Sequence, residues 1–435
     1  MVSIKENFLC DTSFFSQAQN AFIPQYAFVS FSQDGRTALD PCVRLGDTVT
    51  EGQVIAGKNA ASEAKVHSPI PGEVCGIVGF RVPNGRIHTG AKIRFAGSFQ
   101  YEGRGHSVYD WKNATPKELT EKLAENGVVN TFAKNRSLSQ QVKKTSANLV
   151  VRLYDEDPSM LTDSFAAFHH FREIAEGAAV VAKIIGAKGV TFLYSSKHGF
   201  SPDKAYCASL FERLTSGGQA VKLLYLAVPQ HKYPLGTAEK SAQIIKKASL
   251  LEPFSKITSR DLFIDALTAF NVYKAVVLSI PVMSALVHVS GCVKKPCIIS
   301  AKIGTLIKEI AHECGGFTRD TKTVIINGML QGASVNVLET PITKSIKSIR
   351  FLPSAHVKPQ RYTQCMKCGR CQNVCPMRLL PSALFSHAAG IKILDAATAS
   401  SVKYCSGCAL CNTVCPARLP LSQFITFVKE NTHGR

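Results

Sequence analysis

The sequence predicts a multidomain α/β protein that ends in a small cysteine-rich domain. Three observations carry this prediction. The chain has 435 residues, which is more than one domain usually contains. Its central part alternates between strand-like and helix-like segments, a pattern typical of a mainly parallel sheet. Eight of its 15 cysteines lie in two identical arrays near the C-terminus.

Composition limits the classes of partner and compartment. The chain carries 51 Lys and Arg against 31 Asp and Glu, a net charge of +20, which favours nucleic acid, an anionic membrane surface or an acidic protein as partner. The apolar stretch 275–289 is shorter than a bilayer span and contains Pro281, so we expect no transmembrane segment. Lys5 and Glu6 stand where a signal peptide would be apolar, so we expect reduced thiols or metal ligands rather than a disulfide framework.

Residues 1–105 are predicted to form a barrel-sandwich scaffold domain. Residues 43–55 alternate as two short strands, and residues 66–74 resemble a hairpin that turns at Pro71-Gly72. The two halves are similar to a biotinyl/lipoyl-type sandwich. A carrier domain of that type has a lysine at the hairpin tip, whereas the tip here is Pro-Gly, so we expect a scaffold and not a carrier.

Residues 106–280 are predicted to form a Rossmann-like α/β domain. Thr115, Pro116 and Glu118 form the N-cap, the first-turn proline and the capping box of a helix that Gly127 ends. The segments after this helix alternate in type. The strands are expected at 148–153, 190–194 and 221–228, and the helices at 163–185, 202–214 and 237–248.

Residues 281–345 are predicted to form a β-grasp (SLBB-like) module. The order is strand, turn, strand, helix and strand, over 286–290, 297–301, 305–314 and 323–326. Cys292 and Cys297 flank the turn without a second cysteine pair nearby, so we interpret them as packing or turn residues rather than metal ligands.

Residues 346–435 are predicted to form a helical domain with two [4Fe–4S] clusters. Both arrays read C-x2-C-x2-C-x3-C-P, the ferredoxin run, in which three thiolates surround one cluster and the fourth ligates the other. The predicted ligands of the first cluster are Cys365, Cys368, Cys371 and Cys415. The predicted ligands of the second are Cys405, Cys408, Cys411 and Cys375. Gly369 and Gly407 are expected where the backbone must approach inorganic sulfur closely. The alternative is a pair of zinc sites, although zinc ligands usually come as two CxxC pairs separated by a longer loop.

The positive charge follows the cysteines. Residues 341–435 hold 13 Lys and Arg against Asp395 and Glu430, which places +11 of the net +20 in this part. Part of this charge would offset the clusters, each about −2 with its four thiolates. The remainder suits an acidic redox partner or anionic lipid, with an ordinary solvated face as the alternative. No nucleic-acid recognition motif accompanies it.

The order of these parts resembles the RnfC family, whose members are subunits of the Rnf ion-translocating electron transport complexes. The resemblance covers roughly residues 40–425. The local matches are 66–74 (VHSPIPGEV), 232–236 (KYPLG), 289–291 (VSG), 303–305 (IGT), 313–316 (ECGG), 326–332 (INGMLQG) and 341–344 (PITK).

One family motif is missing. The resemblance implies a G-x-G-G-A-G-F-P loop that holds FMN phosphate and admits NADH, but residues 127–139 contain no glycine after Gly127. The family's E-C-E-P segment survives only as D-E-D-P at 155–158, and its glycine-rich lysine turn has become 236–240. We therefore expect neither FMN nor NADH to bind; Lys134 and Arg136 are the remaining phosphate candidates.

The resemblance implies a peripheral subunit of a translocase on the cytoplasmic face of the cell membrane. Two clusters would relay electrons between an acidic flavodoxin or ferredoxin and the membrane subunits, with no catalytic acid, base or nucleophile in the chain. The alternatives are an FMN-containing NADH dehydrogenase module of the same complex, a structural iron–sulfur scaffold subunit, and a corrinoid reductase related to RnfC.

Overall fold

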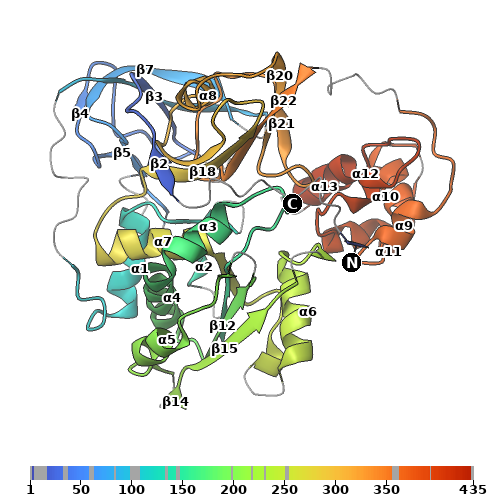
Figure 1. Cartoon of the computed structure of the whole chain (residues 1–435), viewed down its shortest axis with the longest axis horizontal. Coiled ribbons are helices and arrows are strands. Elements are labelled where there is room, and N and C mark those ends of the chain that lie inside the picture. The colour runs from blue at the N-terminus through green and yellow to red at the C-terminus, as the bar shows by residue number, and fades with distance from the viewer. Residues whose placement is uncertain are drawn as a thin grey trace.

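The computed structural model describes residues 2–3, 17–32, 38–57, 63–82, 85–97, 108–132, 136–143, 147–196, 199–216, 219–229, 232–249, 254–354, 362–391 and 393–432. Within these residues, two β-rich parts lie together at one end and a parallel sheet with its helices lies below them (Figure 1). A small helical lobe stands to the side. We call this lobe, residues 362–391 and 393–432, the cluster lobe.

The N-terminal β-rich part is an antiparallel four-stranded sheet with a two-stranded ribbon. The sheet order is β3 (Tyr26–Ser30), β8 (Ile87–Phe95), β7 (Gly72–Arg81) and β4 (Thr48–Val49), and the ribbon joins β5 (Val54–Ala56) to β6 (Val66–His67). Alternate residues of β3, Ala27 and Val29, are buried, as expected for a strand with one face on the core.

The hairpin predicted at residues 66–74 is wrong. β6 pairs with β5, whereas β7 pairs with β4 and β8, so the two segments lie in different sheets. Gly72 serves a close approach rather than a turn, because a Cβ there would lie 1.9 Å from the carbonyl oxygen of Arg94 on β8.

The central part is a four-stranded parallel sheet covered by helices on both faces. Its order is β15 (Lys222–Ala227), β12 (Gly189–Tyr194), β11 (Asn148–Arg152) and β17 (Leu262–Asp265). All five residues of β11 are buried, which suits a central parallel strand. Three of these strands were predicted; β17 was not.

The helices of the central part are α1 (Pro116–Glu125), α3 (Thr162–His169), α4 (Phe171–Ile185), α5 (Lys204–Phe211), α6 (Ala238–Ala248) and α7 (Ala266–Val272). The capping box of α1 is confirmed. The single helix predicted over 163–185 is wrong, because His170 (φ −130°, ψ 32°) separates α3 from α4 and stacks on Phe270 with ring centroids 4.6 Å apart. Gly177 lets α4 and α7 cross closely, since a Cβ there would lie 2.0 Å from the Ala269 carbonyl oxygen.

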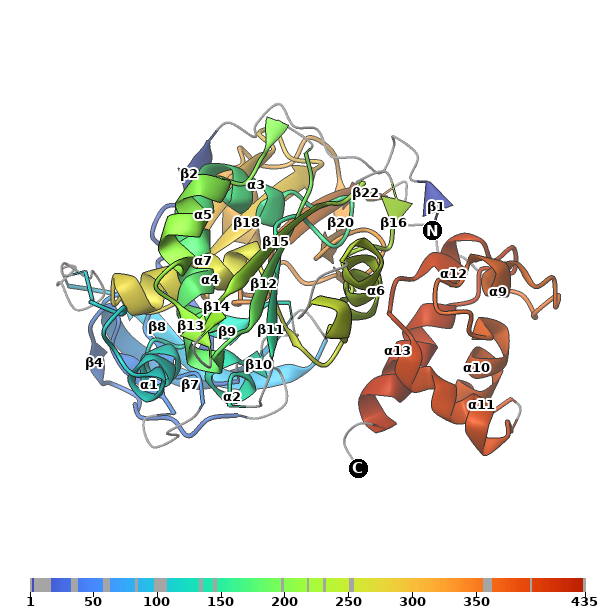
Figure 2. The same ribbon diagram turned by 90° about the horizontal axis from the view of Figure 1, so that it is seen from below.

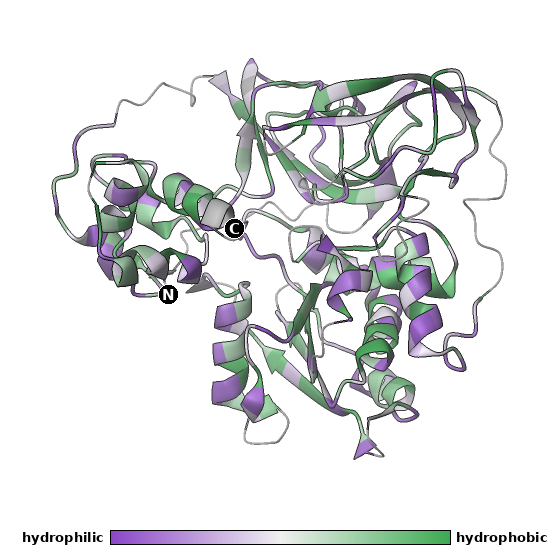
Figure 3. Cartoon of the chain, turned by 180° about the vertical axis from the view of Figure 1, so that it is seen from behind, coloured by the Kyte–Doolittle hydropathy of each residue, from purple (hydrophilic) through white to green (hydrophobic). Residues whose placement is uncertain are grey.

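The shorter elements around the central sheet are β9 (Val129–Asn130), β10 (Arg136–Ser137), α2 (Leu138–Gln141), β13 (Thr215–Ser216), β14 (Gln219–Ala220), the 3-10 turn Phe254–Lys256 and the π-helical turn Tyr273–Val277. Ile55 of the ribbon, Leu119 of α1 and Val181 of α4 belong to one buried core. The N-terminal part and the central part are therefore packed together rather than loosely tethered. Hydrophobic residues run along the strands of the central sheet, while α6 carries hydrophilic residues as well (Figure 3).

The second β-rich part is a six-stranded sheet covered by α8 (Ile307–Glu313). Its order is β2 (Ala18–Asn20), β19 (Cys297–Lys302), β18 (Ser284–Gly291), β22 (Ser348–Pro353), β20 (Thr321–Ile326) and β21 (Ala333–Val335). Two of its strands, β2 and β22, come from outside the segment 281–345. Strand pairing between distant segments leaves no local sequence signal, so these boundaries were drawn too narrowly for the sheet.

The cluster lobe is helical, and the helix expected between the two arrays is confirmed. Its elements are α9 (Arg370–Val374), α10 (Pro381–Ala388), α11 (Ala396–Ser400), the 3-10 turn Ser401–Tyr404, α12 (Leu410–Thr413) and α13 (Leu421–Thr432). The lobe faces α6, β16 (Lys232–Tyr233) and β1 (Val2–Ser3), and α9 lies on its outer side (Figure 2). Among the described residues, no helix has the length and apolarity that a membrane span requires.

Candidate functional site

Two small cavities in the cluster lobe are each lined by four cysteines. We call them site 1 and site 2. Site 1 is lined by Cys365, Cys368, Cys371 and Cys415. Site 2 is lined by Cys375, Cys405, Cys408 and Cys411. Each site takes three cysteines from one array and the fourth from the other, which is the grouping that the sequence predicts.

The two arrays fold alike, through left-handed turns at matching positions. Lys367 and Gly369 have φ of 54° and 73°, and their counterparts Gly407 and Ala409 have φ of 71° and 57°. The tight turn is therefore repeated, while glycine occupies only one of its two positions in each array. The turns bring backbone N–H groups towards sulfur: Gly407 N lies 3.5 Å from Cys405 Sγ. Such contacts lower the electron density on a ligand sulfur and raise a cluster's reduction potential.

The donor set fits an iron–sulfur cluster. Burial raises the pKa of Cys405 and Cys408, and burial together with the neighbouring thiols raises the pKa of Cys411 to about 12. Unassisted thiols of this kind are poor nucleophiles, and only nearby positive charge, such as iron, would make them thiolates. Within the described ranges, no three His, Cys, Asp or Glu side chains converge as tightly as a single metal ion requires. Thiols spread around a cavity suit a multi-iron cluster better than one zinc ion.

Site 2 lies against the body of the protein, whereas site 1 reaches the surface. Cys408 of site 2 is buried and packs with Tyr233, whose hydroxyl donates to the Cys408 carbonyl at 2.9 Å. Lys240 of α6 donates from Nζ to the Pro376 carbonyl at 2.9 Å. Cys368 of site 1 is exposed. The two sites therefore differ in access to solvent and partners.

The second candidate region is the carboxyl edge of the parallel sheet. Ligands of open α/β sheets bind where the strand order reverses, which here is between β11 and β17. Arg152 ends β11 and Asp265 ends β17, and both are buried. Phe132 also lies here, stacked on Phe263 at 5.6 Å and 4.7 Å from the Arg152 guanidinium.

A buried ion network fills this edge. It consists of Arg152, Asp163, Asp265 and Lys347. Lys347 Nζ lies 2.7 Å from Asp163 Oδ2 and 2.5 Å from Asp265 Oδ2. Arg152 Nη2 lies 3.6 Å from Asp163 Oδ2 and 4.0 Å from Asp265 Oδ2. Because Lys347 directly precedes β22, the network joins the six-stranded sheet to the parallel sheet.

The network carries two opposite pKa shifts. Burial raises the pKa of Asp163 to about 7, against the opposing effect of Lys347 and with the support of nearby Asp265. Burial acts the same way on Asp265, but Lys347 and Arg152 outweigh it, so its pKa lies below the usual range. Burial opposes charge on Lys347 as well, but the two carboxylates outweigh it and raise its pKa. Asp265 is thus the permanently ionised partner, and Asp163 the carboxyl that can take a proton near neutrality.

Backbone donors that could hold a phosphate at this edge already bind the chain's own carboxylates. Asp155 accepts hydrogen bonds from Asp163 N at 2.9 Å and Ser164 N at 3.0 Å, at the N-terminus of α3. Asp157 accepts from Leu330 N at 2.8 Å and from Ser159 N at 2.9 Å. The degenerate D-E-D-P segment therefore supplies internal anions, and the described residues do not fit a flavin phosphate.

The two phosphate candidates are not brought to this edge together. Arg136 is exposed on β10, opposite Asn130 of β9. Lys134 lies outside the described residues.

Sequence reasoning missed one cysteine contact. Cys297 is buried, as its interpretation as a packing residue requires, and its Sγ lies 3.6 Å from Cys314 Sγ. The two residues lie on β19 and at the end of α8, so no spacing rule connects them.

Comparisons with known proteins agree with this organisation. Residues 11–94 match the family model described as the RnfC barrel sandwich hybrid domain, and residues 361–419 match that of the 4Fe-4S dicluster domain. The chain is 27% identical over 356 residues to the RnfC counterpart in the ion-translocating oxidoreductase complex of Rhodobacter capsulatus. It belongs to the RnfC family.

Another RnfC-type protein and one solved structure are also similar. The corresponding component of the proton-translocating ferredoxin:NAD(+) oxidoreductase complex of Clostridium ljungdahlii is 23% identical over 83% of the chain and 78% of that relative. The Rhodobacter match covers 79% of the chain but 66% of the relative, slightly less than two thirds of its length. The NAD+-reducing [NiFe]-hydrogenase in the H2-reduced state is similar over 75% of the chain and 62% of its own, with 10% identity and a TM-score of 0.49.

Proposed function

We propose that the chain is a peripheral electron-transfer subunit of an Rnf-like ion-translocating oxidoreductase. It would hold two [4Fe–4S] clusters and connect a soluble carrier, an acidic flavodoxin or ferredoxin, with membrane subunits on the cytoplasmic face. The observation that carries this proposal is the crossed grouping of eight cysteines around two cavities of one lobe. Membership of the RnfC family supports the kind of complex.

When bound, the clusters supply one-electron redox chemistry. The residues of this chain hold them, exclude water and set the local charge. Lys240 and Lys429 place ammonium groups on the carbonyls of Pro376 and Cys405, beside site 2. Positive charge held near a cluster favours its reduced state, so these lysines would raise the potential of the cluster in site 2.

We also propose that the α/β part, residues 106–280, is a Rossmann-like domain that now acts as a scaffold without FMN or NADH. The strand order β15-β12-β11-β17 supports the Rossmann-like interpretation. The filled carboxyl edge, with its ion network and internal carboxylates, supports the loss of the flavin. For the module 281–345, the antiparallel pair β18 and β19 with α8 supports a β-grasp interpretation.

The test is anaerobic purification followed by iron, sulfide and flavin analysis, and then reduction with NADH or with a reduced flavodoxin or ferredoxin. We expect about eight iron atoms per chain, no flavin, no response to NADH and reduction by the protein carrier. Bound FMN with rapid bleaching by NADH would show instead the NADH dehydrogenase module. Clusters that dithionite reduces but no carrier or membrane partner reaches would show the structural scaffold.

A further inference from the structure

We propose that the protein carrier docks on the exposed edge of site 1, and that this surface selects an acidic single-electron carrier. This inference rests on the proposed function and adds the face and chemistry of the partner. We call the surface the site 1 face; it consists of Tyr362, Met366, Lys367, Cys368, Arg370 and Arg418.

Access differs sharply between the two sites. Cys368 of site 1 is exposed, and beside it Met366 is 62% exposed and Tyr362 is 65% exposed. Cys408 of site 2 is 8% exposed because Tyr233 and its neighbours cover it. Single electrons pass between proteins when their redox centres lie close, so a partner outside this chain approaches site 1 more closely than site 2.

The composition of the site 1 face fits a protein partner. Large exposed tyrosine and methionine side chains are enriched at interfaces, where they supply apolar contact area. They lie here next to three exposed cations, Lys367, Arg370 and Arg418. Backbone pairing brings the two segments together, since Thr363 N donates to the Ala417 carbonyl at 3.1 Å.

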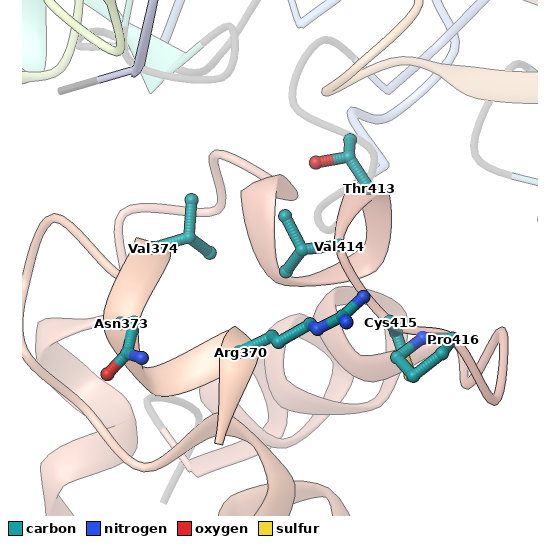
Figure 4. Close-up of a pocket in the computed structure, with 7 residues that line it drawn as sticks. All are labelled: Arg370, Asn373, Val374, Thr413, Val414, Cys415 and Pro416. Atoms are coloured by element: carbon teal, nitrogen blue, oxygen red, sulfur yellow. The ribbon is translucent and has the colours of Figure 1, made fainter. Parts of the chain in front are cut away.

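A groove continues this face towards the second array. It is lined by Arg370, Asn373, Val374, Thr413, Val414, Cys415 and Pro416. In Figure 4 the Arg370 side chain reaches across the groove from α9 towards Cys415 and Pro416. A site 1 cysteine thus lies in a hollow that has apolar walls and a guanidinium group at its mouth.

The charge of the lobe determines the sign of the partner. Asp395 and Glu430 are the acidic residues in the described part of the lobe, and neither belongs to the site 1 face. Asp395 caps the N-terminus of α11, where its carboxylate accepts from Thr398 N at 2.9 Å. An uncompensated positive face attracts an acidic surface and speeds its encounter at low salt.

The docked exchange balances simply. The carrier loses one electron and the chain gains it, or the reverse, and no bond or proton is transferred. The proposal therefore needs no further co-reactant.

The experiment measures carrier binding and stopped-flow electron exchange for the cluster-loaded full chain, with an acidic flavodoxin as the probe. The test variants are Lys367→Glu/Arg418→Glu and, separately, Met366→Glu. The matched control is Lys117→Glu/Lys222→Glu, two exposed lysines of the central part. A site 2 comparison is Lys247→Glu/Arg378→Glu, whose side chains line a groove beside Cys375. Iron content and the EPR spectrum establish that each variant keeps its clusters.

We expect the double charge reversal at site 1 to lower the second-order rate by at least about tenfold at low salt and to weaken its salt dependence. We expect Met366→Glu to weaken binding, and the control to stay within about twofold. Equal losses in test and control variants, or a larger loss in the site 2 comparison, would overturn the docking face while the function stands. A wild-type chain with both clusters that neither binds the flavodoxin nor exchanges electrons with it would overturn the proposed function as well.

Discussion

Replacing Lys347 by methionine tests whether the buried ion network holds the molecule together. The wild-type network contains two cations and two carboxylates, so its formal charges cancel. Methionine has a similar length but no charge. In the Lys347→Met protein, Asp163 and Asp265 would face only Arg152, and one buried negative charge would be uncompensated.

The geometry sets the size of the effect. Lys347 Nζ lies within 2.7 Å of both carboxylates, whose side chains are fully buried, and the lysine side chain itself is 8% exposed. A unit charge pair about 4 Å apart is worth roughly 4 kcal/mol at an effective dielectric constant of about 20. Breaking one partner of a buried pair costs about 3–5 kcal/mol net, and we expect that loss in the free energy of unfolding.

The loss should depend on pH. The pKa of Asp163 is raised to about 7 in the folded protein, above its ordinary value of 3.8. This group therefore favours the fold most when protonated, and its contribution is lost as pH rises from about 4 to 7. Without Lys347 the pKa of Asp163 rises further, and a proton can neutralise the extra charge. We expect the stability difference between wild type and variant to shrink at low pH, by at most about 1.4 kcal/mol per pH unit for one proton.

The assay is urea unfolding of both proteins at pH 6 and pH 8, with hydrogen exchange at β11, β17 and β22 as a local readout. The double variant Lys347→Met/Asp163→Asn removes one charge of each sign and should recover part of the loss. Lys308→Met is the matched control, because its 4.0 Å pair with Glu339 is exposed and should contribute less than about 1 kcal/mol. A Lys347→Met protein as stable as the control at pH 8, or no recovery in the double variant, would refute the reasoning.

Three further predictions concern the sites and the domain junction. Cys375→Ser should remove or alter the cluster held by the second array and leave the other intact; EPR showing loss of the first-array cluster would contradict the crossed ligation. Lys240→Met should lower the midpoint potential of the site 2 cluster in a redox titration and leave site 1 unchanged, because an ammonium group next to site 2 is lost; an unchanged site 2 potential would contradict the role of Lys240. Burial lowers the pKa of Lys344, whose Nζ donates to the Gly127 carbonyl at 2.6 Å, to about 7. The folded protein therefore loses stability through this group as pH falls from 10.5 to 7, and Lys344→Met should remove up to about 1.4 kcal/mol per unit of that slope in unfolding measured between pH 7 and 9; parallel pH profiles would speak against it.

Local signals were read correctly where one segment contains the whole interaction. The capping box of α1 needs only Thr115 and Glu118, three residues apart, and its helix begins where expected. Strands β11, β12 and β15 were found because each is a short apolar run with turn residues around it. β17 is equally apolar but only four residues long, and the apolar α7 follows it directly. The pattern therefore does not show where strand ends and helix begins.

The break between α3 and α4 shows a different limit. Neither proline nor glycine marks it; His170 leaves the helical conformation and stacks its ring on Phe270, a residue 100 positions away in α7. A contact of that range has no trace in the periodicity of residues 163–185. The same holds for β2, which joins a sheet whose other strands lie more than 260 residues further along the chain.

The sequence by itself determined the donor chemistry of this protein, because cysteines two or three residues apart stay together in any fold of the chain. It also determined that the net positive charge follows those cysteines and that the glycine-rich loop is missing. Only the tertiary structure decided which cysteines reach the surface, since Tyr233 covers site 2 from a strand about 175 residues away. It alone brought Lys347 to Asp163 and Asp265, because long-range packing, rather than spacing, determines which charges are buried together.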